Sequence, residues 1–265
     1  MMSRIALTFK RLRRKGRAAL IPYVVAGDPD LGTTEALVLQ MAESGADIIE
    51  LGLPFSDPLA DGPIIQAASE RALRNGVNLT KVFGLAEKLK GGSTPLILMT
   101  YFNPVSKFGL RDFAESCHDS GFEGVIIPDL PPEEAGPWIR EARAFDLDTI
   151  FLVAPTSTPD RIKLISKWSR GFIYYVSVTG VTGTRETLPD ELEQAIRRVK
   201  EHSKKPVAVG FGISTPDQAR TMSRFADGVI VGSAIVKIIG EKLDSPDLVN
   251  QVGNFVTSLA QALKS

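Results

Sequence analysis

The sequence has few of the side chains that disulfides, metal sites and nucleophilic triads require. Its 265 residues include one cysteine, Cys117, and two histidines, His118 and His202. A lone cysteine cannot form an internal disulfide, which is typical of a reducing compartment. Both histidines fall in helix-like stretches far from predicted strand ends, so we expect neither a histidine triad nor a metal site. Cys117 and His118 are adjacent on a predicted helix and do not face each other, so we expect both to be ordinary helix positions.

Net charge and long apolar runs are missing as well. The 31 basic residues balance the 31 acidic ones, whereas a nucleic-acid-binding protein usually carries a basic excess. No apolar run reaches the roughly 18 residues that span a bilayer. There is no P-loop, and Gly210-Phe211-Gly212 lacks the rest of a dinucleotide fingerprint. We therefore expect a cytoplasmic protein, or a protein of the plastid stroma if the source is eukaryotic, without a nucleic-acid or membrane partner.

Acidic residues are absent from the first 27 positions. Seven basic residues occur there, namely Arg4, Lys10, Arg11, Arg13, Arg14, Lys15 and Arg17. A basic, acid-poor N-terminus is typical of a transit peptide. Ile5, Phe9 and Leu12, however, share one face of a helix. We favour a helix within residues 1–17 that caps one end of the domain, and the targeting segment remains the alternative.

Short apolar runs recur along the chain at regular intervals. The eight runs are Ala19–Val25, Asp47–Leu53, Pro95–Tyr101, Gly124–Pro128, Thr149–Val153, Phe172–Val176, Val207–Gly210 and Gly228–Val231. They have few alternating polar positions, as expected of parallel strands that are covered on both faces.

Helix-like stretches fill the intervals between these runs. They are Thr33–Ser44, Ile64–Arg74, Leu79–Lys90, Asp112–Ser120, Glu133–Ala144, Pro159–Lys167, Leu188–His202 and Pro216–Arg224. Eight strand–helix units in about 250 residues predict a closed (β/α)8 barrel, and we expect residues 1–265 to form a single domain.

Glu50 is the one charged residue inside an apolar strand, Ile48-Ile49-Glu50-Leu51-Gly52. Strand alternation places it on the face shared by Ile48 and Gly52. It also lies near the carboxyl end of the strand, where barrel enzymes keep their catalytic groups, and burial would raise its pKa into a range useful for proton transfer. The structural alternative is a carboxylate bonded to a neighbouring arginine or to the backbone.

A long loop, Pro54–Pro63, follows this strand and contains Asp57 and Asp61. Aspartate before proline or glycine is common in turns, so either residue could be purely structural. The loop would nevertheless lie over the catalytic face. One of its carboxylates could then pair with Glu50 across a substrate and divide acid and base roles with it.

Three glycine-rich segments follow the sixth, seventh and eighth predicted strands. They are Gly180–Gly183, Gly210–Ser214 and Gly232–Ala234. Loops at these places often bind phosphate in barrels, together with a helix N-terminus. We expect Ser233 to cap a short helix, Ala234–Ile239, that points at such a site. The stretch Thr179–Thr187 is either a lid or an ordinary surface loop. Together these features predict a barrel enzyme that acts on a phosphorylated ligand by carboxylate acid–base catalysis.

The segment Glu50–Pro63, with Gly210–Ser214 and Gly232–Val236 in the same order, resembles the signature of tryptophan synthase α subunits. The resemblance extends from about Pro22 to the C-terminus. It implies a lyase of tryptophan biosynthesis that cleaves indole-3-glycerol phosphate into indole and glyceraldehyde 3-phosphate by a retro-aldol reaction. It makes Glu50 the acid–base group at indole C3 and Asp61 the partner of the indole N–H.

The resemblance also implies roles for other positions. Tyr174 would lie near the glycerol moiety, and Thr182 would be a lid residue. The phosphate-binding positions would be Gly183, Gly212, Gly232 and Ser233. The indole pocket would be lined by Tyr23, Met99, Ile126, Leu152, Phe211 and Ile230. Tyr23 and Met99 differ from the residue types typical of the best-known members but remain large and apolar enough to pack against indole.

A partner follows from the same resemblance. It implies an α2β2 heterotetramer with a β subunit that holds pyridoxal phosphate, so no cofactor is expected in this chain. The interface would include Asp57, Asn103, Phe108 and Asp129. Three alternatives remain: a free-standing indole-3-glycerol phosphate lyase, another phosphate-binding barrel enzyme, and a degenerate barrel without catalysis.

Overall fold

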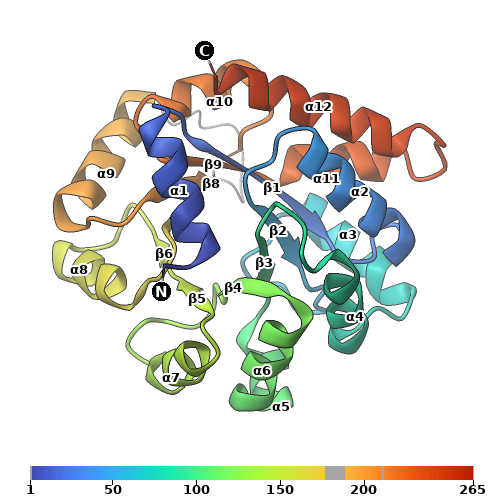
Figure 1. Cartoon of the computed structure of the whole chain (residues 1–265), viewed down its shortest axis with the longest axis horizontal. Helices are drawn as coiled ribbons and strands as arrows, with labels where there is room; N and C mark the ends of the chain where they lie inside the picture. The colour runs from blue at the N-terminus through green and yellow to red at the C-terminus, as the bar shows by residue number, and fades with distance from the viewer. Residues whose placement is uncertain (1, 177–188, 211, 265) are drawn as a thin grey trace.

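The computed structural model describes residues 2–176, 189–210 and 212–264. Nine parallel strands form one sheet in the order β5-β4-β3-β2-β1-β9-β8-β7-β6 (Figure 1). Their bounds are β1 Ala19–Val25, β2 Ile49–Gly52, β3 Leu96–Met99, β4 Phe122–Ile126, β5 Asp148–Ile150, β6 Leu152–Val153, β7 Ile173–Val176, β8 Val207–Gly210 and β9 Gly228–Val231.

The sheet closes because its two end strands, β5 and β6, are separated in the chain only by Phe151. The carbonyl of Phe151 accepts a hydrogen bond from the Tyr174 N–H at 3.0 Å. The predicted strand Thr149–Val153 is therefore two strands, one paired with β4 and the other with β7. The break lies where pairing passes from one neighbour to the next, and the predicted (β/α)8 barrel is confirmed.

Helices surround the barrel (Figure 1). They are α1 Arg4–Arg14, α2 Leu31–Glu43, α3 Pro63–Arg74, α4 Leu79–Leu89, α5 Phe102–Phe108, α6 Leu110–Ser120, α7 Gly136–Ala144, α8 Pro159–Trp168, α9 Pro189–His202, α10 Pro216–Ser223, α11 Ser233–Glu241 and α12 Leu248–Ala262. Helices α5 and α12 were not expected from the sequence. Helix α7 begins three residues later than predicted, because a turn with a hydrogen bond from the Glu134 N–H to the Pro131 carbonyl precedes it.

Helix α1 closes one end of the barrel. Its face Ile5, Phe9 and Leu12 is almost fully buried and packs with side chains that the strands point inward, among them Phe172. The Phe9 and Phe172 ring centroids lie 5.4 Å apart. Ser3 caps the helix by accepting a hydrogen bond from the Ala6 N–H. The predicted N-terminal capping helix is confirmed, although its ordered turns span Arg4–Arg14 rather than residues 1–17.

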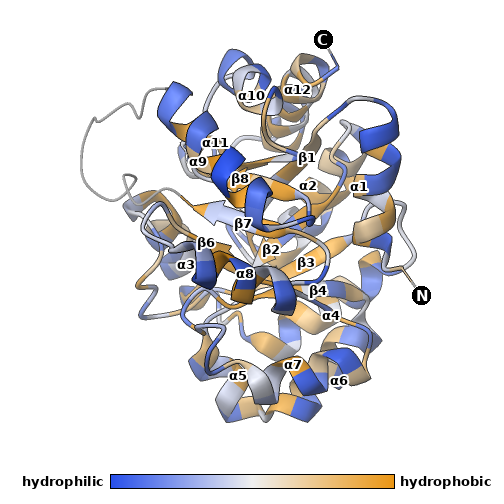
Figure 2. Ribbon diagram, turned by 90° about the vertical axis from the view of Figure 1, so that its left-hand side faces the viewer, coloured by the Kyte–Doolittle hydropathy of each residue, from blue (hydrophilic) through white to orange (hydrophobic). Residues whose placement is uncertain are grey.

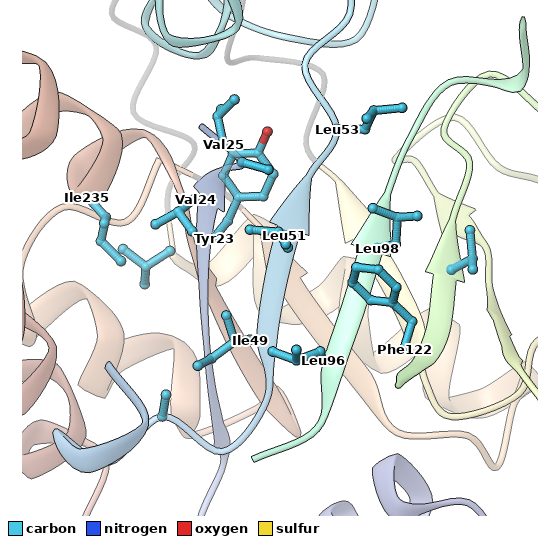
Figure 3. Close-up of a cluster of buried hydrophobic side chains, with 14 of the residues drawn as sticks. Tyr23, Val24, Val25, Ile49, Leu51, Leu53, Leu96, Leu98, Phe122 and Ile235 are labelled. Atoms are coloured by element: carbon cyan, nitrogen blue, oxygen red, sulfur yellow. The ribbon is translucent and has the colours of Figure 1, made fainter. Parts of the chain in front are cut away.

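The opposite strand faces build the larger hydrophobic layer between the barrel and its helices. The strands are mainly apolar along their length (Figure 2). Figure 3 shows Leu51 and Leu98 on neighbouring strands of this layer, with Ile235 of α11 directed toward Val24 of β1. Burial on both faces explains why the strands are continuously apolar in sequence and leaves Glu50 as an exception.

Candidate active site

Glu50 lies in β2 beside Tyr23 of β1, its register partner. Its side chain is 1 % exposed, and neither carboxyl oxygen has a hydrogen-bond partner among the described residues. Burial, followed by the nearby charge of Asp61, raises the pKa of the Glu50 carboxyl from 4.5 to about 8. A buried carboxyl without an arginine or backbone donor does not match the structural alternative and is typical of a catalytic acid.

Asp61 reaches the same place from the loop that follows β2. Its side chain is 8 % exposed, and the loop is held by hydrogen bonds from the Asp61 N–H to the Pro58 carbonyl and from Gln66 Nε2 to the Asp61 carbonyl. Burial raises the pKa of the Asp61 carboxyl to about 6, while a hydrogen bond with Tyr101 opposes the shift. The structure thus brings together the two carboxylates that sequence reasoning singled out.

Tyr101 is a site residue that sequence reasoning missed. Its hydroxyl accepts a hydrogen bond from the Ala60 N–H at 3.0 Å and forms a second hydrogen bond with the Asp61 carboxyl. Its ring stacks on Phe55, with centroids 5.2 Å apart. Tyr101 therefore connects the end of the β3 segment to the loop and holds Asp61 over the barrel. The only signal in the sequence was an aromatic residue with a hydroxyl at the carboxyl end of a predicted strand.

Tyr23 and Tyr174 complete the group of polar side chains around Glu50. Burial is the main cause that raises the pKa of each hydroxyl well above its ordinary value, and the charges of Glu50 and Asp61 add to it. Each ring occupies space left by a glycine on the adjacent strand. A Cβ on Gly52 would lie 2.2 Å from the Tyr23 hydroxyl, and a Cβ on Gly210 would lie 2.4 Å from that of Tyr174. The missing side chains let both tyrosines lie across the barrel mouth.

Apolar side chains line the interior below these polar groups. Ile126 and Ile230 are buried inside the barrel, and Met99 and Leu152 pack against them while remaining partly exposed. Strand register places Met99 beside Ile126 and Leu152 beside Tyr174. Of the predicted indole-pocket residues, Phe211 lies outside the described residues.

The predicted phosphate-binding positions Gly212, Gly232 and Ser233 follow β8 and β9. Gly212 has φ +41°, in the region that favours glycine. Ser233 does not cap the helix as predicted: α11 begins at Ser233 itself, Gly232 is the N-cap, and no side chain caps this terminus. Gly183, Thr182 and the predicted lid lie outside the described residues.

The predicted interface residues lie in the loop after β2, in α5 and in the turn after β4. Asp57 accepts a hydrogen bond from the Ser56 hydroxyl, and Asp129 accepts one from the Phe102 N–H at 2.8 Å, which fixes the start of α5. Asn103 is exposed on α5. Phe108 is 37 % exposed and packs edge-on against Phe83. The contacts of Asp129 and Phe108 are those of structural residues on an accessible surface.

Two further observations concern the described part of the chain. It contains no group of three or more histidine, cysteine, aspartate or glutamate side chains placed to hold a metal ion. It also contains no helix that is long and apolar enough to cross a membrane.

The family model for the tryptophan synthase alpha chain matches residues 9–264. The chain belongs to the tryptophan synthase alpha chain family. The alpha chain of Geobacter sulfurreducens is 48 % identical over 99 % of both chains, and that of Prochlorococcus marinus is 47 % identical over 98 % of this chain and 94 % of the relative.

Solved structures of the family agree with the fold. The alpha subunit from Legionella pneumophila has a TM-score of 0.93 at 38 % identity, with 99 % of each chain covered. A chain of tryptophan synthase from Mycobacterium tuberculosis has a TM-score of 0.92 at 39 % identity, with both chains fully covered. The family therefore accounts for the whole barrel.

Proposed function

We propose that this chain cleaves indole-3-glycerol phosphate to indole and glyceraldehyde 3-phosphate as the α subunit of a tryptophan synthase. The observation that carries the proposal is the carboxyl of Glu50, which is buried and unpartnered at the barrel mouth beside Asp61. Family membership supports the reaction, and the geometry supports the division of roles between the two carboxyls.

The two pKa values divide the roles. A carboxyl with a pKa of about 8 is mainly protonated at neutral pH, so Glu50 is the acid. A carboxyl with a pKa of about 6 is mainly ionised there, so Asp61 carries the negative charge. Two environments thus give one acid and one anion in the same small space.

The substrate's indole ring would lie against Met99, Ile126, Leu152 and Ile230, with Tyr23 at its edge. The apolar walls bury the ring, and one face of the site remains polar. Asp61 would accept a hydrogen bond from the indole N–H and stabilise the positive charge that develops on the ring when C3 is protonated. Tyr101 would keep that carboxylate in position.

The substrate phosphate would bind at the N-terminus of α11. This terminus has no side-chain cap, so its first N–H groups remain free for an anion, and the helix dipole favours negative charge there. Gly212 lets the backbone after β8 approach the same ligand. Gly183 and Ser233 complete this proposed set, and Tyr174 would lie beside the glycerol chain.

Glu50 both donates and takes up a proton in this reaction. Its carboxyl gives a proton to indole C3, which converts that carbon to a tetrahedral centre and weakens its bond to the glycerol carbon. The bond breaks as the adjacent hydroxyl loses its proton and becomes the aldehyde, and the electron pair restores the indole ring. The Glu50 carboxylate can take up the released proton, so one group serves both steps. Thr182, from the proposed lid, would contact this group on closure.

The partner in this proposal is a β subunit that holds pyridoxal phosphate, in an α2β2 assembly. Asp57, Asn103, Phe108 and Asp129 would lie at the interface, and no cofactor is assigned to this chain. We place the protein in the cytoplasm, where tryptophan biosynthesis would use it. All the relatives named above carry the synthase name, so the free-standing lyase gains no support from them.

Indole release from indole-3-glycerol phosphate tests the proposal. We expect slow release by the chain alone, faster release with a compatible β subunit, and loss of activity in Glu50→Gln with retained binding of glycerol 3-phosphate. Fast release that β leaves unchanged would indicate a free-standing lyase. Normal turnover by Glu50→Gln would refute the assigned acid.

A further inference from the structure

A cavity lies at the end of the barrel opposite Glu50. Its volume is about 650 Å³, and it is lined by Ala18, Pro206 and Asp227, the residues that immediately precede β1, β8 and β9. Glu50 of β2 pairs in register with the carboxyl-terminal half of β1, and Gly212 and Gly232 follow the carboxyl ends of β8 and β9. The two sites are therefore separated by the length of the barrel interior.

Basic side chains dominate the walls of this cavity. Helix α1 and the turn after it contribute Lys10, Arg13 and Arg17. Helix α9 contributes Lys200, and the segment before β8 contributes Lys204 and Lys205. Arg224, which follows α10, adds a seventh cation. Asp227 is the one acidic residue among the described lining residues, and it is already paired with Lys200 at 2.9 Å.

Four of these seven cations, namely Lys10, Arg13, Lys204 and Arg224, form no ion pair with any described residue. Arg17 donates through Nη2 to Asp47 at 2.5 Å, but its buried Nη1 has no hydrogen-bond partner. In a chain of zero net charge, this local excess is a concentrated positive field that attracts anions.

The positive surface continues into an adjoining cavity of about 560 Å³. The two share Arg17 and Arg224, and Lys15, Arg220 and Lys264 line the second one. Its described lining contains no acidic residue. The cations thus face the space from helix α1, from the chain before β8, from the region of α10 and from Lys264 after α12, which is more than one phosphate group requires.

We propose that this cleft, formed by the residues that line the first cavity, binds a small polyphosphorylated anion. Cations on several sides match a chain of phosphates, and the volume lies within the roughly 300–1,000 Å³ of small-molecule sites. The partly exposed Phe225 adds apolar surface. A nucleoside triphosphate and an inorganic polyphosphate share this chemistry. The acid-free N-terminal sequence acquires a role here beyond capping the barrel.

Calorimetric titration of the full chain with inorganic triphosphate tests the site. Saturating glycerol 3-phosphate is present throughout and fills the proposed substrate site. Triphosphate binding then reports on the basic cleft alone, and its failure is distinguishable from failure of the proposed lyase function. We expect saturable binding that weakens as potassium chloride is raised. A parallel titration with ATP distinguishes a nucleotide ligand from an inorganic polyphosphate. Tighter binding of ATP than of triphosphate indicates a nucleotide, and equal binding indicates recognition of the phosphate chain alone.

The matched variants remove three charges each. Arg13→Ala/Lys204→Ala/Arg224→Ala should weaken triphosphate binding about tenfold or more, because charge-assisted contacts are lost. Lys81→Ala/Arg140→Ala/Lys242→Ala, whose exposed side chains line neither cavity, should bind like the parent chain.

Two results would overturn the proposal: no saturable binding of triphosphate, or equal weakening of that binding in the two triple variants. Thermal unfolding of each variant establishes that it is folded. If the cleft variant does not fold, the single variants Lys204→Ala and Arg224→Ala replace it, and unchanged affinity in both would refute the site.

Discussion

Catalysis by this barrel should depend on pH through two carboxyls whose pKa values lie on either side of neutrality. The active form has Glu50 protonated and Asp61 ionised. With pKa values of about 8 and about 6, roughly four fifths of the protein has this form at pH 7. At pH 9, only about one eleventh of Glu50 remains protonated, so kcat/KM should fall roughly ninefold. A similar fall is expected at pH 5, where Asp61 becomes protonated.

Substitution of Asp61 by asparagine should change this profile in a defined way. The acidic limb should disappear, because the group that titrates there is gone. The alkaline limb should move to lower pH, because the charge of Asp61 is the second cause that raises the pKa of Glu50. It should stay well above 4.5, because burial is the first cause. Loss of the charge that stabilises the indole ring should reduce kcat/KM about 10²- to 10³-fold.

The assay is steady-state indole release between pH 5 and pH 9.5 by the parent chain and Asp61→Asn. Asp119→Asn is the matched control, because it removes the same charge from an exposed position on α6. Its profile should overlay that of the parent chain. An alkaline limb that stays in place in Asp61→Asn would show that the two carboxyls do not interact, and the division of roles would fail.

Three other substitutions test the surrounding structure. Tyr101→Phe removes the hydroxyl that lowers the pKa of the Asp61 carboxyl, so the acidic limb of the pH profile should move to higher pH and kcat should fall about tenfold. An unchanged acidic limb would exclude the role of Tyr101 in positioning Asp61. Gly210→Ala should displace the Tyr174 ring and raise KM, whereas Gly84→Ala, which meets open space in α4, should leave KM unchanged and stabilise the fold by about 0.5–1 kcal/mol. Equal KM values in the two glycine variants would contradict the close contact. The raised pKa of the Glu50 carboxyl makes its contribution to stability fully present below pH 4.5, and this contribution is lost as pH rises through about 8. In urea unfolding, Glu50→Gln should therefore gain stability relative to the parent chain between pH 5 and pH 9, by at most about 4 kcal/mol. A difference in unfolding free energy that stays constant with pH would refute the raised pKa.

The fold could be predicted from the sequence because the apolar runs, the helical intervals between them and the N-terminal helix face all indicate the same architecture. Apolar runs recur with helical intervals, and the face Ile5, Phe9 and Leu12 identified the capping helix correctly. Element ends were less accurate, as at Phe151, because strand ends depend on which neighbour each residue pairs with. Helix α12 was missed although Val252 and Val256 are buried at helical spacing.

The site was predicted in part. Glu50 could be identified because a buried charge inside an apolar strand has few explanations. Tyr101 could not, because an aromatic residue at the end of an apolar run is usually part of the core, and the partner of its hydroxyl arrives from a separate loop. Ser233 was assigned as a cap because serine favours that position, but the helix starts one residue earlier than expected. The basic cleft was not predictable either, since its walls come together only in the folded chain.

A comparison of the buried acids at the two ends of the barrel supports the proposed role of Glu50. At the end closed by α1, Asp47 accepts hydrogen bonds from Arg17 and from the Leu20 N–H. Asp148, equally buried, pairs with Arg170 at 3.3 Å and accepts a hydrogen bond from the Ser3 hydroxyl. These carboxylates hold the chain together and have the donors that burial of charge requires. Glu50 has comparable burial and no such donor, so the folded chain gains nothing from its charge. A carboxyl kept in that state is complete only when a ligand supplies the missing partner.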